Sequence, residues 1–397
     1  MKTSLKISFI LLVMLIGYLF YQAHAMEEDV PFEPPPQPKF EKAVIIDAEQ
    51  IEKLEYQSST MPIEQRQSVT LKVLSGKLRG RILSYAHMAS GGMLGSEMIL
   101  KKGDKIIVYV EENPSKAESP DGSPLIQIDT YKRDGTLFFL AILYAVILVA
   151  VGGKKGLKAL ASLFLTIAII FFIMFPLILR GMSPIFVSVV VSGIVSWIVF
   201  RIVGGKTKKS QAAALGTLIG VTIAGLLAMI VGMIMHLTGL SSEESKILLY
   251  SVNIKLNFQG LLFSGMLIGA LGAVMDVGMS IASAIDEVRK IHPEATFKNL
   301  FNAGMNVGRD IMGTMSNTLI LAYTGSSLPL LLLFMAGNTP FVKIMNLELV
   351  AEEIVRAFAG SIGLVLAIPI TAFISAVLYS EHQLEIPEGW ITGKKDN

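Results

Sequence analysis

Long apolar runs dominate the chain after residue 135. A helix of about 20 residues crosses a hydrocarbon core about 30 Å thick, so runs close to this length predict membrane spans. The seven predicted spans are residues 136–152, 158–179, 183–203, 211–237, 258–284, 311–336 and 355–380. The pattern therefore predicts an all-α polytopic membrane bundle over residues 132–380.

The chain before the first span has a different pattern. Residues 26–42 contain the proline-rich stretch VPFEPPPQPKF, which we expect to be an extended spacer. Residues 43–131 alternate apolar and polar positions in short runs that turn residues separate. The five predicted strands are KAVIIDA, QSVTLKVLS, RGRILSYA, DKIIVYVEE and PLIQIDTYK. They predict a small extracytoplasmic β-rich domain, for which an OB-like barrel is the candidate fold.

The first 25 residues have the form of an export signal. MKTSLK supplies two lysines, ISFILLVMLIGYLF supplies an apolar core, and Ala23-His24-Ala25 has the form of a cleavage site. A cleaved signal peptide and an uncleaved signal anchor are both compatible with this pattern. Either one places the chain after Ala25 outside the membrane.

The distribution of basic residues supports this orientation. With residues 26–135 outside, the loops alternate sides, and cytoplasmic loops are expected to hold more Lys and Arg. The predicted inner segments, including the tail at 381–397, contain Lys154, Lys155, Lys158, Arg201, Lys206, Lys208, Lys209, Arg289, Lys290, Lys298, Arg309, Lys394 and Lys395. The predicted outer loops contain Arg180, Lys246, Lys255, Lys343 and Arg356. The asymmetry predicts a cytoplasmic C-terminus.

One predicted span carries an ionisable residue. At 100° per residue, small and polar side chains of this segment share a strip of roughly 80°. The strip comprises Gly265, Gly269, Gly272, Asp276, Ser280, Ser283 and Glu287. The glycines predict close helix packing. Asp276 costs about 2.5–3.5 kcal/mol at a helix centre, so it must face protein or water.

A second polar strip follows in the next segment, which begins after Pro293. The second strip comprises Asn299, Asn302, Asn306, Asp310, Gly313, Asn317 and Thr324. We expect the residues before Ile311 to lie along the inner surface. Three partners are open for Asp276: the amide of Asn317, which could donate a hydrogen bond to it, water, and a transported cation. The candidate inner-gate charges are Asp286, Glu287, Arg289 and Arg309. Arg309 is expected to reach Asp286, Glu287 or Asp310.

Other spans carry packing patterns and end groups. Gly216 and Gly220 have the spacing of a close helix contact, as do Gly360 and Gly363 in the last span. His236 is expected at the membrane interface. The pair Glu352-Glu353, close to Arg356, is expected in a solvated outer loop.

Composition narrows the chemistry. The chain is 52% hydrophobic and 17% charged, and it has no cysteine, which excludes disulfides and thiolate chemistry. It has no Walker lysine loop and no H-E-x-x-H motif. We therefore expect no enzyme activity, no metal site and no cofactor. The outer domain lacks a cluster of aromatic and basic residues, so we expect no nucleic acid partner.

The two polar strips also carry a family resemblance. DVGMSIASAIDEV, followed by NVGRDIMGTMSNTLILAYTGSSLPLLL, resembles the YibE/F-like family of bacterial multi-span membrane proteins. The resemblance extends over about residues 130–380. It implies a location in the bacterial plasma membrane and an exported N-terminal region before a helical membrane domain. It implies no particular substrate.

Two functions are compatible with these patterns. The first is a permease that moves a small solute or ion, with candidate binding residues Asp276, Ser280, Ser283, Asn306, Asp310 and Asn317. The second is a membrane scaffold or envelope sensor that acts through its outer domain. Besides the lipid bilayer, an envelope protein and a homo-oligomer remain open as partners. Many transporters contain inverted repeats, and we find no internal match of that kind.

Overall fold

The computed structural model describes residues 39–49, 52–54, 64–88, 98–111, 125–251 and 256–380. The chain divides into one compact unit of residues 33–147, the outer unit, and a second that contains residues 148–397, the helical unit. The signal or anchor at 1–25, most of the proline-rich spacer and the tail at 381–397 lie outside the described residues.

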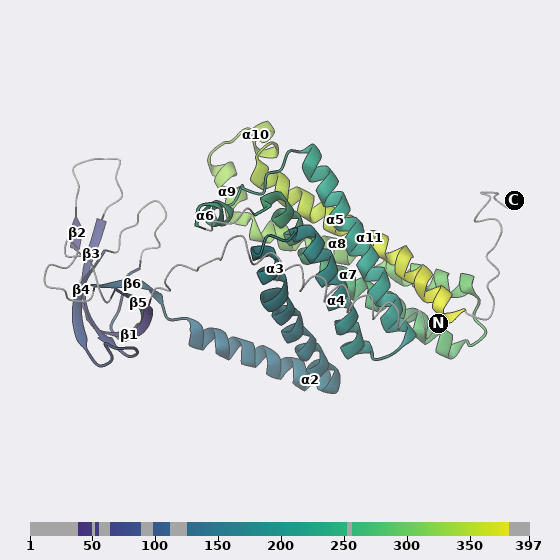
Figure 1. Ribbon diagram of the computed structural model, residues 1–397, viewed down its shortest axis with the longest axis horizontal. Helices are drawn as coiled ribbons and strands as arrows, with labels where there is room; N and C mark the ends of the chain where they lie inside the picture. The colour runs from purple at the N-terminus through teal and green to yellow at the C-terminus, as the bar shows by residue number, and fades with distance from the viewer. Residues whose placement is uncertain are drawn as a thin grey trace. The chain divides into compact units, whose positions relative to one another are not determined.

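The outer unit contains an antiparallel sheet (Figure 1). Its strands are β1 (Lys39–Ala48), β2 (Glu52–Leu54), β3 (Glu64–Val73), β4 (Ile82–Met88), β5 (Lys105–Glu111) and β6 (Leu125–Tyr131). Their order is β2-β3-β1-β5-β6, and β4 also pairs with β3. The five predicted strands are confirmed, and β1 begins within the predicted spacer. Because no pairing joins β4 to β6 in the described ranges, the OB-like barrel is not confirmed.

The alternation predicted from sequence places one face of this sheet in a core. Its fully or nearly fully buried side chains include Ala43, Ile45, Val69, Leu71, Val73, Ile106 and Val108. Residues Met98–Leu100 are attached to the sheet by side chains. The amide of Gln67 donates to the Leu100 carbonyl at 2.8 Å and accepts from its N–H at 3.0 Å. His87 Nε2 lies 2.9 Å from the Met98 carbonyl. Two buried polar side chains thus replace a missing backbone partner.

Acid is expected to destabilise the outer unit through His87. Burial lowers the pKa of His87 from its ordinary value of 6.5, and the bond to Met98 opposes this only in part. The stability that neutral His87 provides is therefore present above about pH 6.5 and is lost as the pH falls toward the lower folded-state pKa. We expect amide exchange in residues 64–88 to accelerate between about pH 7 and pH 5, after correction for intrinsic exchange. His87→Gln should remove most of this acceleration, and an unchanged acid response would contradict the prediction.

The helical unit is built from long apolar helices. The helices are α2 (Asp134–Ile169), the π-helical turn η1 (Ile170–Met174), α3 (Phe175–Leu179), α4 (Pro184–Gly204), α5 (Lys208–Ile234), α6 (Glu243–Ser251), α7 (Phe258–Ile291), α8 (Phe297–Ser326), α9 (Leu328–Ala336), α10 (Phe341–Met345) and α11 (Glu348–Tyr379). Among the described residues, five segments are long and apolar enough to cross a membrane: Asp134–Leu179, α4, α5, α7 and α11. A sixth results if α8 and α9, bent by 59°, count as one span.

Seven spans are therefore not confirmed. The first two predicted spans fall within the 46-residue segment Asp134–Leu179, which Gly153 interrupts with φ 53° and ψ −132°. The chain folds back closely there, since a Cβ on Gly156 would lie 2.1 Å from the Leu148 carbonyl oxygen. The residues before Ile311 and the start of the predicted span 311–336 belong to one helix, because α8 is continuous from its Thr296 cap to Ser326. The bend precedes Pro329, whose ring favours the first turn of a helix.

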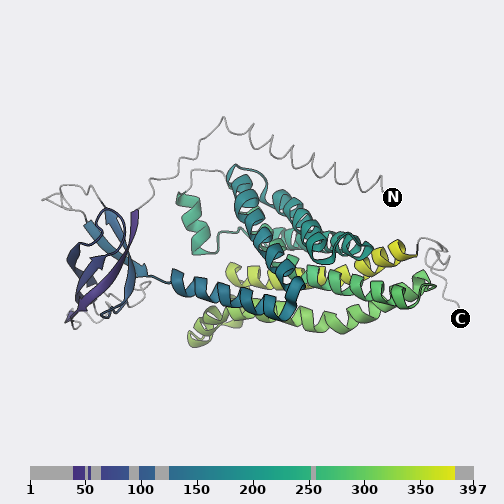
Figure 2. The same ribbon diagram turned by 90° about the horizontal axis from the view of Figure 1, so that it is seen from below.

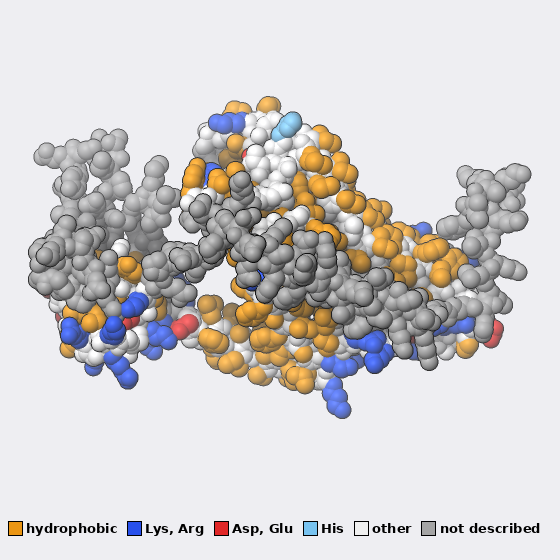
Figure 3. Space-filling model, viewed as in Figure 1, with side chains coloured by type: hydrophobic (Ala, Val, Ile, Leu, Met, Phe, Trp, Pro, Cys, Tyr) orange, Lys and Arg blue, Asp and Glu red, His pale blue; other side chains and the backbone are white. Residues whose placement is uncertain are grey.

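Three helices form the centre of the helical unit. Helices α5, α7 and α11 pack against one another in every pair, α8 packs on α7 and α11, and α4 packs on α5 and α7 (Figure 2). The buried side chains between them include Phe263, Leu267, Ile281, Ile285 and Leu364. Hydrophobic side chains also cover much of the outer surface of these helices (Figure 3). An apolar surface over an apolar core is typical of helices that pack in lipid.

Candidate functional site

The first polar strip lies on the open face of α7. Asn257 caps this helix by accepting from the Gly260 N–H at 2.7 Å. At ~1.5 Å per residue, Asp276 lies about 27 Å from the start of α7 and about 22 Å from its end. The buried face of the helix carries Val274, Val277 and Ile281, each 0% exposed. The strip on the opposite face is exposed from Gly265 to Glu287, except for half-buried Ser283.

The side chain of Asp276 lies alone among the described residues. Its carboxylate forms no hydrogen bond or ion pair with any residue that the structure describes, and the Ser280 hydroxyl donates to the Asp276 backbone carbonyl at 2.8 Å. The candidate hydrogen bond from Asn317 is absent from the described contacts. Asp276 is therefore an isolated carboxylate midway along a membrane-length helix.

The second polar strip lies open on α8. Asn306, Asp310, Gly313 and Asn317 are exposed, whereas Leu300, Gly304, Gly308 and Leu319 form the buried face. The two buried glycines set the rotation of the helix. A Cβ on Gly304 would lie 2.6 Å from Ile285 Cδ1, and a Cβ on Gly308 would lie 2.1 Å from Ile368 Cγ2. Because α8 packs through this small apolar face, both strips remain open within one chain.

The glycines of the strips and those of α5 have different surroundings. A Cβ on Gly265, Gly272 or Gly313 would meet nothing within 4 Å, whereas one on Gly269 would lie 2.7 Å from the Tyr323 hydroxyl. On α5, a Cβ on Gly216 would lie 2.0 Å from Thr371 Oγ1. A Cβ on Gly220 would lie 2.6 Å from Ala367 Cβ. The small residues of α5 and α11 therefore pack helix on helix, and most of those in the strips do not.

A charge network joins three helices at the end where α7 finishes. The Tyr379 hydroxyl donates to Asp286 at 2.6 Å, and Asp286 pairs with Lys290 at 2.9 Å and with Lys209 at 3.7 Å. Glu287 pairs with Lys290 at the surface, at 2.6 Å. Of the candidate inner-gate charges, Asp286 thus has the most partners. Lys209 and Tyr379 were missed, because a pattern on one helix does not show which residues of other helices meet it.

The two candidate arginines bind elsewhere. Arg289 donates to the Ala295 carbonyl at 3.0 Å, which stabilises the turn between α7 and α8. Arg309 lies within 3.4 Å of the Asn306 side chain on its own helix. Within the described residues it forms no ion pair with Asp286, Glu287 or Asp310, so that expectation is wrong.

A second polar cluster lies at the start of α11. Glu352 is only 5% exposed, and its Oε2 accepts from the Ser241 hydroxyl at 2.6 Å. Glu353 pairs with Arg356 at 2.8 Å. The prediction of a solvated loop is therefore wrong. Helix α11 begins at Glu348, and Ala351 and Val355 pack with buried residues of α5 and α7, which draws the intervening polar residues into the bundle.

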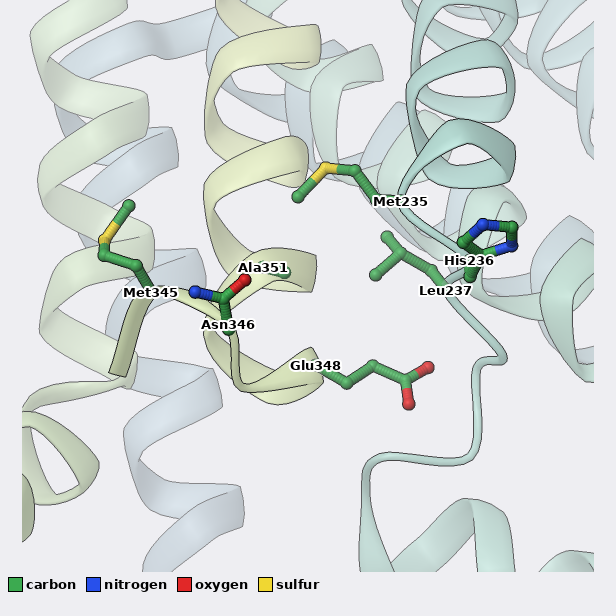
Figure 4. A pocket seen from close by; sticks show the side chains of 7 residues that line it. All are labelled: Met235, His236, Leu237, Met345, Asn346, Glu348 and Ala351. Carbon is green, nitrogen blue, oxygen red and sulfur yellow. The ribbon is translucent and has the colours of Figure 1, made fainter. Parts of the chain in front are cut away.

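Two pockets open at this end of the helical unit. Figure 4 shows the first, about 220 Å³ in volume, where exposed His236 turns the chain with φ 54°. Glu348, which also lines this first pocket, points its carboxylate toward the backbone after Leu237. The carboxylate accepts a hydrogen bond from the Thr238 hydroxyl at 2.7 Å. The second pocket, about 280 Å³, is lined in part by Gly265, Glu352, Glu353 and Arg356. It therefore joins the first residue of the α7 strip to the charged start of α11.

The described ranges contain no group of three or more His, Asp or Glu side chains arranged to hold a metal ion. The chemistry available here is that of isolated carboxylates, amides and hydroxyls. Such groups bind protons, hard cations and small polar solutes.

The apolar helices and their packing define a multi-pass membrane protein with an added antiparallel sheet. The model of the YibE/F-like protein family matches residues 140–381, more than half of the chain, and the protein belongs to this family. The match runs from within α2 to the end of α11 and includes Asp276, Asn317 and Glu352. The resemblance seen in the two polar strips is thus confirmed. No curated protein and no solved structure matches the sequence.

Proposed function

We propose that this protein is a permease of the bacterial plasma membrane that moves a small solute or ion, with Asp276 as its proton- or cation-binding group. The outer unit faces away from the cytoplasm in this proposal. The observation that carries it is the Asp276 carboxylate, which lies midway along α7 without a partner in the described chain.

The physical argument begins with the cost of such a group. A carboxylate at the centre of a span is stable only against protein or water, and such residues are typical of ion and proton pathways. The strips of α7 and α8 add Ser280, Asn306 and Asn317 on faces that are open in one chain. Water, a second copy or an envelope protein would have to cover them. A water-filled path along these two strips and past Asp276, called the lane below, accounts for all of these residues together.

The Asp286 network supports a gate at the inner end of that lane. Its ion pair with Lys209 joins α7 to α5, and its hydrogen bond with Tyr379 joins α7 to α11, whereas the pair with Lys290 lies within α7. Protonation or displacement of Asp286 would loosen all three helices at once. We therefore place the gate at Asp286, with Glu287 as a surface contributor.

Flux through reconstituted vesicles tests the role of Asp276. Asp276→Asn removes the charge at nearly constant volume, and we expect proton or Na⁺ flux under an imposed gradient to fall at least about 10-fold, as expected for the loss of an intramembrane ion site. Glu294→Gln is the matched control, because it removes one exposed carboxylate from the turn between α7 and α8. Full flux with an unchanged pH profile in Asp276→Asn would exclude the proposed coupling role.

A membrane scaffold or envelope sensor is the second candidate, favoured by the separate compact outer unit, most of which precedes the family match. Deletion of residues 43–130 distinguishes the two functions. A scaffold should lose its crosslinked partners after this deletion. A permease should retain flux through its helical unit.

A further inference from the structure

The pocket at the start of α11 contains carboxylate oxygens without partners. Oε1 of Glu352 and Oε2 of Glu353 are both buried and form no hydrogen bond within the described chain. The other oxygen of each group is occupied, by Ser241 and by Arg356 respectively. A buried acceptor that lacks a partner costs about 1–3 kcal/mol, more when it is charged. Because both residues line this pocket, the two oxygens favour a ligand with positive charge.

The charge balance narrows the ligand. Glu353 and Arg356 form an ion pair, which leaves the charge of Glu352 as the excess in this pocket. The neighbouring Glu348 lines the other pocket and already binds Thr238. One bound positive charge, either a proton or a monovalent cation, would balance ionised Glu352. The Arg356 Nε is also buried without a described partner, but the two carboxylates of Glu352 and Glu353 outnumber this one arginine, so an anion is disfavoured.

The remaining wall supplies further oxygen atoms. Ser242 and Ser245 line the pocket, and their hydroxyls lie 3.0 Å apart at the start of α6. Carboxylate and hydroxyl oxygens without sulfur or imidazole favour hard cations over transition metals.

We infer that this pocket is a binding site for a monovalent inorganic cation, of which Na⁺ is the probe, with Glu352 as its principal ligand. The inference rests on the proposed function, since it makes the pocket the entry to the lane that passes Asp276. Gly265 connects the two, because it lines the pocket and begins the α7 strip. Tyr323 lies farther along, with its hydroxyl against Gly269.

Binding of radioactive Na⁺ to the purified full-length protein in detergent tests the inference, with choline as the replacement cation. We expect saturable binding that Glu352→Gln weakens at least 10-fold and that Glu352→Asp weakens less. Glu243→Gln, which removes an exposed carboxylate from the start of α6, should bind as the natural protein does. Thermal unfolding of each variant without Na⁺ identifies any variant that fails to fold.

Each result of the Na⁺ binding experiment either supports or contradicts the proposed cation site. Equal binding by a folded Glu352→Gln variant would overturn the inference. So would a natural protein that takes up only a proton in this pocket and binds no Na⁺. Na⁺ binding in detergent needs no transport, so Na⁺ binding without vesicle flux would contradict the permease and leave the site standing. Flux that depends on Asp276, without Na⁺ binding, would contradict the site alone.

Discussion

Gly363→Ala is expected to lower the free energy of unfolding of the helical unit by about 1–3 kcal/mol, the range for forcing extra atoms into a packed core. The new Cβ would lie 2.5 Å from Ala224 Cβ and 2.9 Å from the Gly220 carbonyl oxygen. Both contacts are too short, and the second is to backbone. Relief therefore requires α5 and α11 to separate along their shared glycine face. Thermal unfolding in a fixed detergent should show a drop of several degrees.

Gly272→Ala is the matched control, since it makes the same change in a helix interior. A Cβ on Gly272 meets nothing within 4 Å. Alanine is favoured over glycine in a helix by roughly 0.5–1 kcal/mol, so this variant should be slightly more stable. Equal destabilisation by both variants would contradict the packing argument for Gly363. It would also indicate that a second molecule covers the α7 strip in the purified protein.

Asp286→Ala is expected to lower the free energy of unfolding by about 1–3 kcal/mol, the range for leaving polar groups without their partner. Asp286 is only 13% exposed, and its removal takes away the acceptor of the Tyr379 hydroxyl and the ion pairs with Lys209 and Lys290. Those groups come from α5, α7 and α11. The loss therefore acts on all three central helices.

Glu287→Ala is the control that distinguishes the loss of buried contacts from the loss of one negative charge. Glu287 is the next residue, also pairs with Lys290, and is 63% exposed. Exposed ion pairs contribute about 0–1 kcal/mol, so this variant should unfold close to the natural protein. If Glu287→Ala destabilised the protein as much as Asp286→Ala, the network would owe its effect to net charge and not to the buried contacts.

Local patterns predicted much of this architecture. The five strands were found because side chains alternate across a sheet with a period of two, and the long helices were found because a membrane requires about 20 apolar residues in sequence. The same periodicity showed that Asp276, Ser280 and Glu287 share one face. None of these inferences needs knowledge of a second element.

The hydrogen bond between Asn317 and Asp276 is absent from the described contacts for a physical reason. A helical projection gives the angle of each residue on its own helix, but not the rotation of one helix against another. Gly304 and Gly308 decide that rotation, because they let α8 approach Ile285 and Ile368 closely. The polar faces then remain open.

Glu352 is a second residue whose surroundings could not be predicted from its neighbours in the sequence. Beside Glu353 and Arg356 it has the sequence pattern of a solvated loop, yet Ser241 and the packing of Ala351 and Val355 place it inside the bundle. The sequence by itself determined the membrane class, the main strands, the location of the long apolar segments and the faces on which polar residues lie, because these depend on neighbours along the chain. Only the tertiary structure decided which of those polar residues are paired, open or buried, because that depends on contacts between helices distant in sequence.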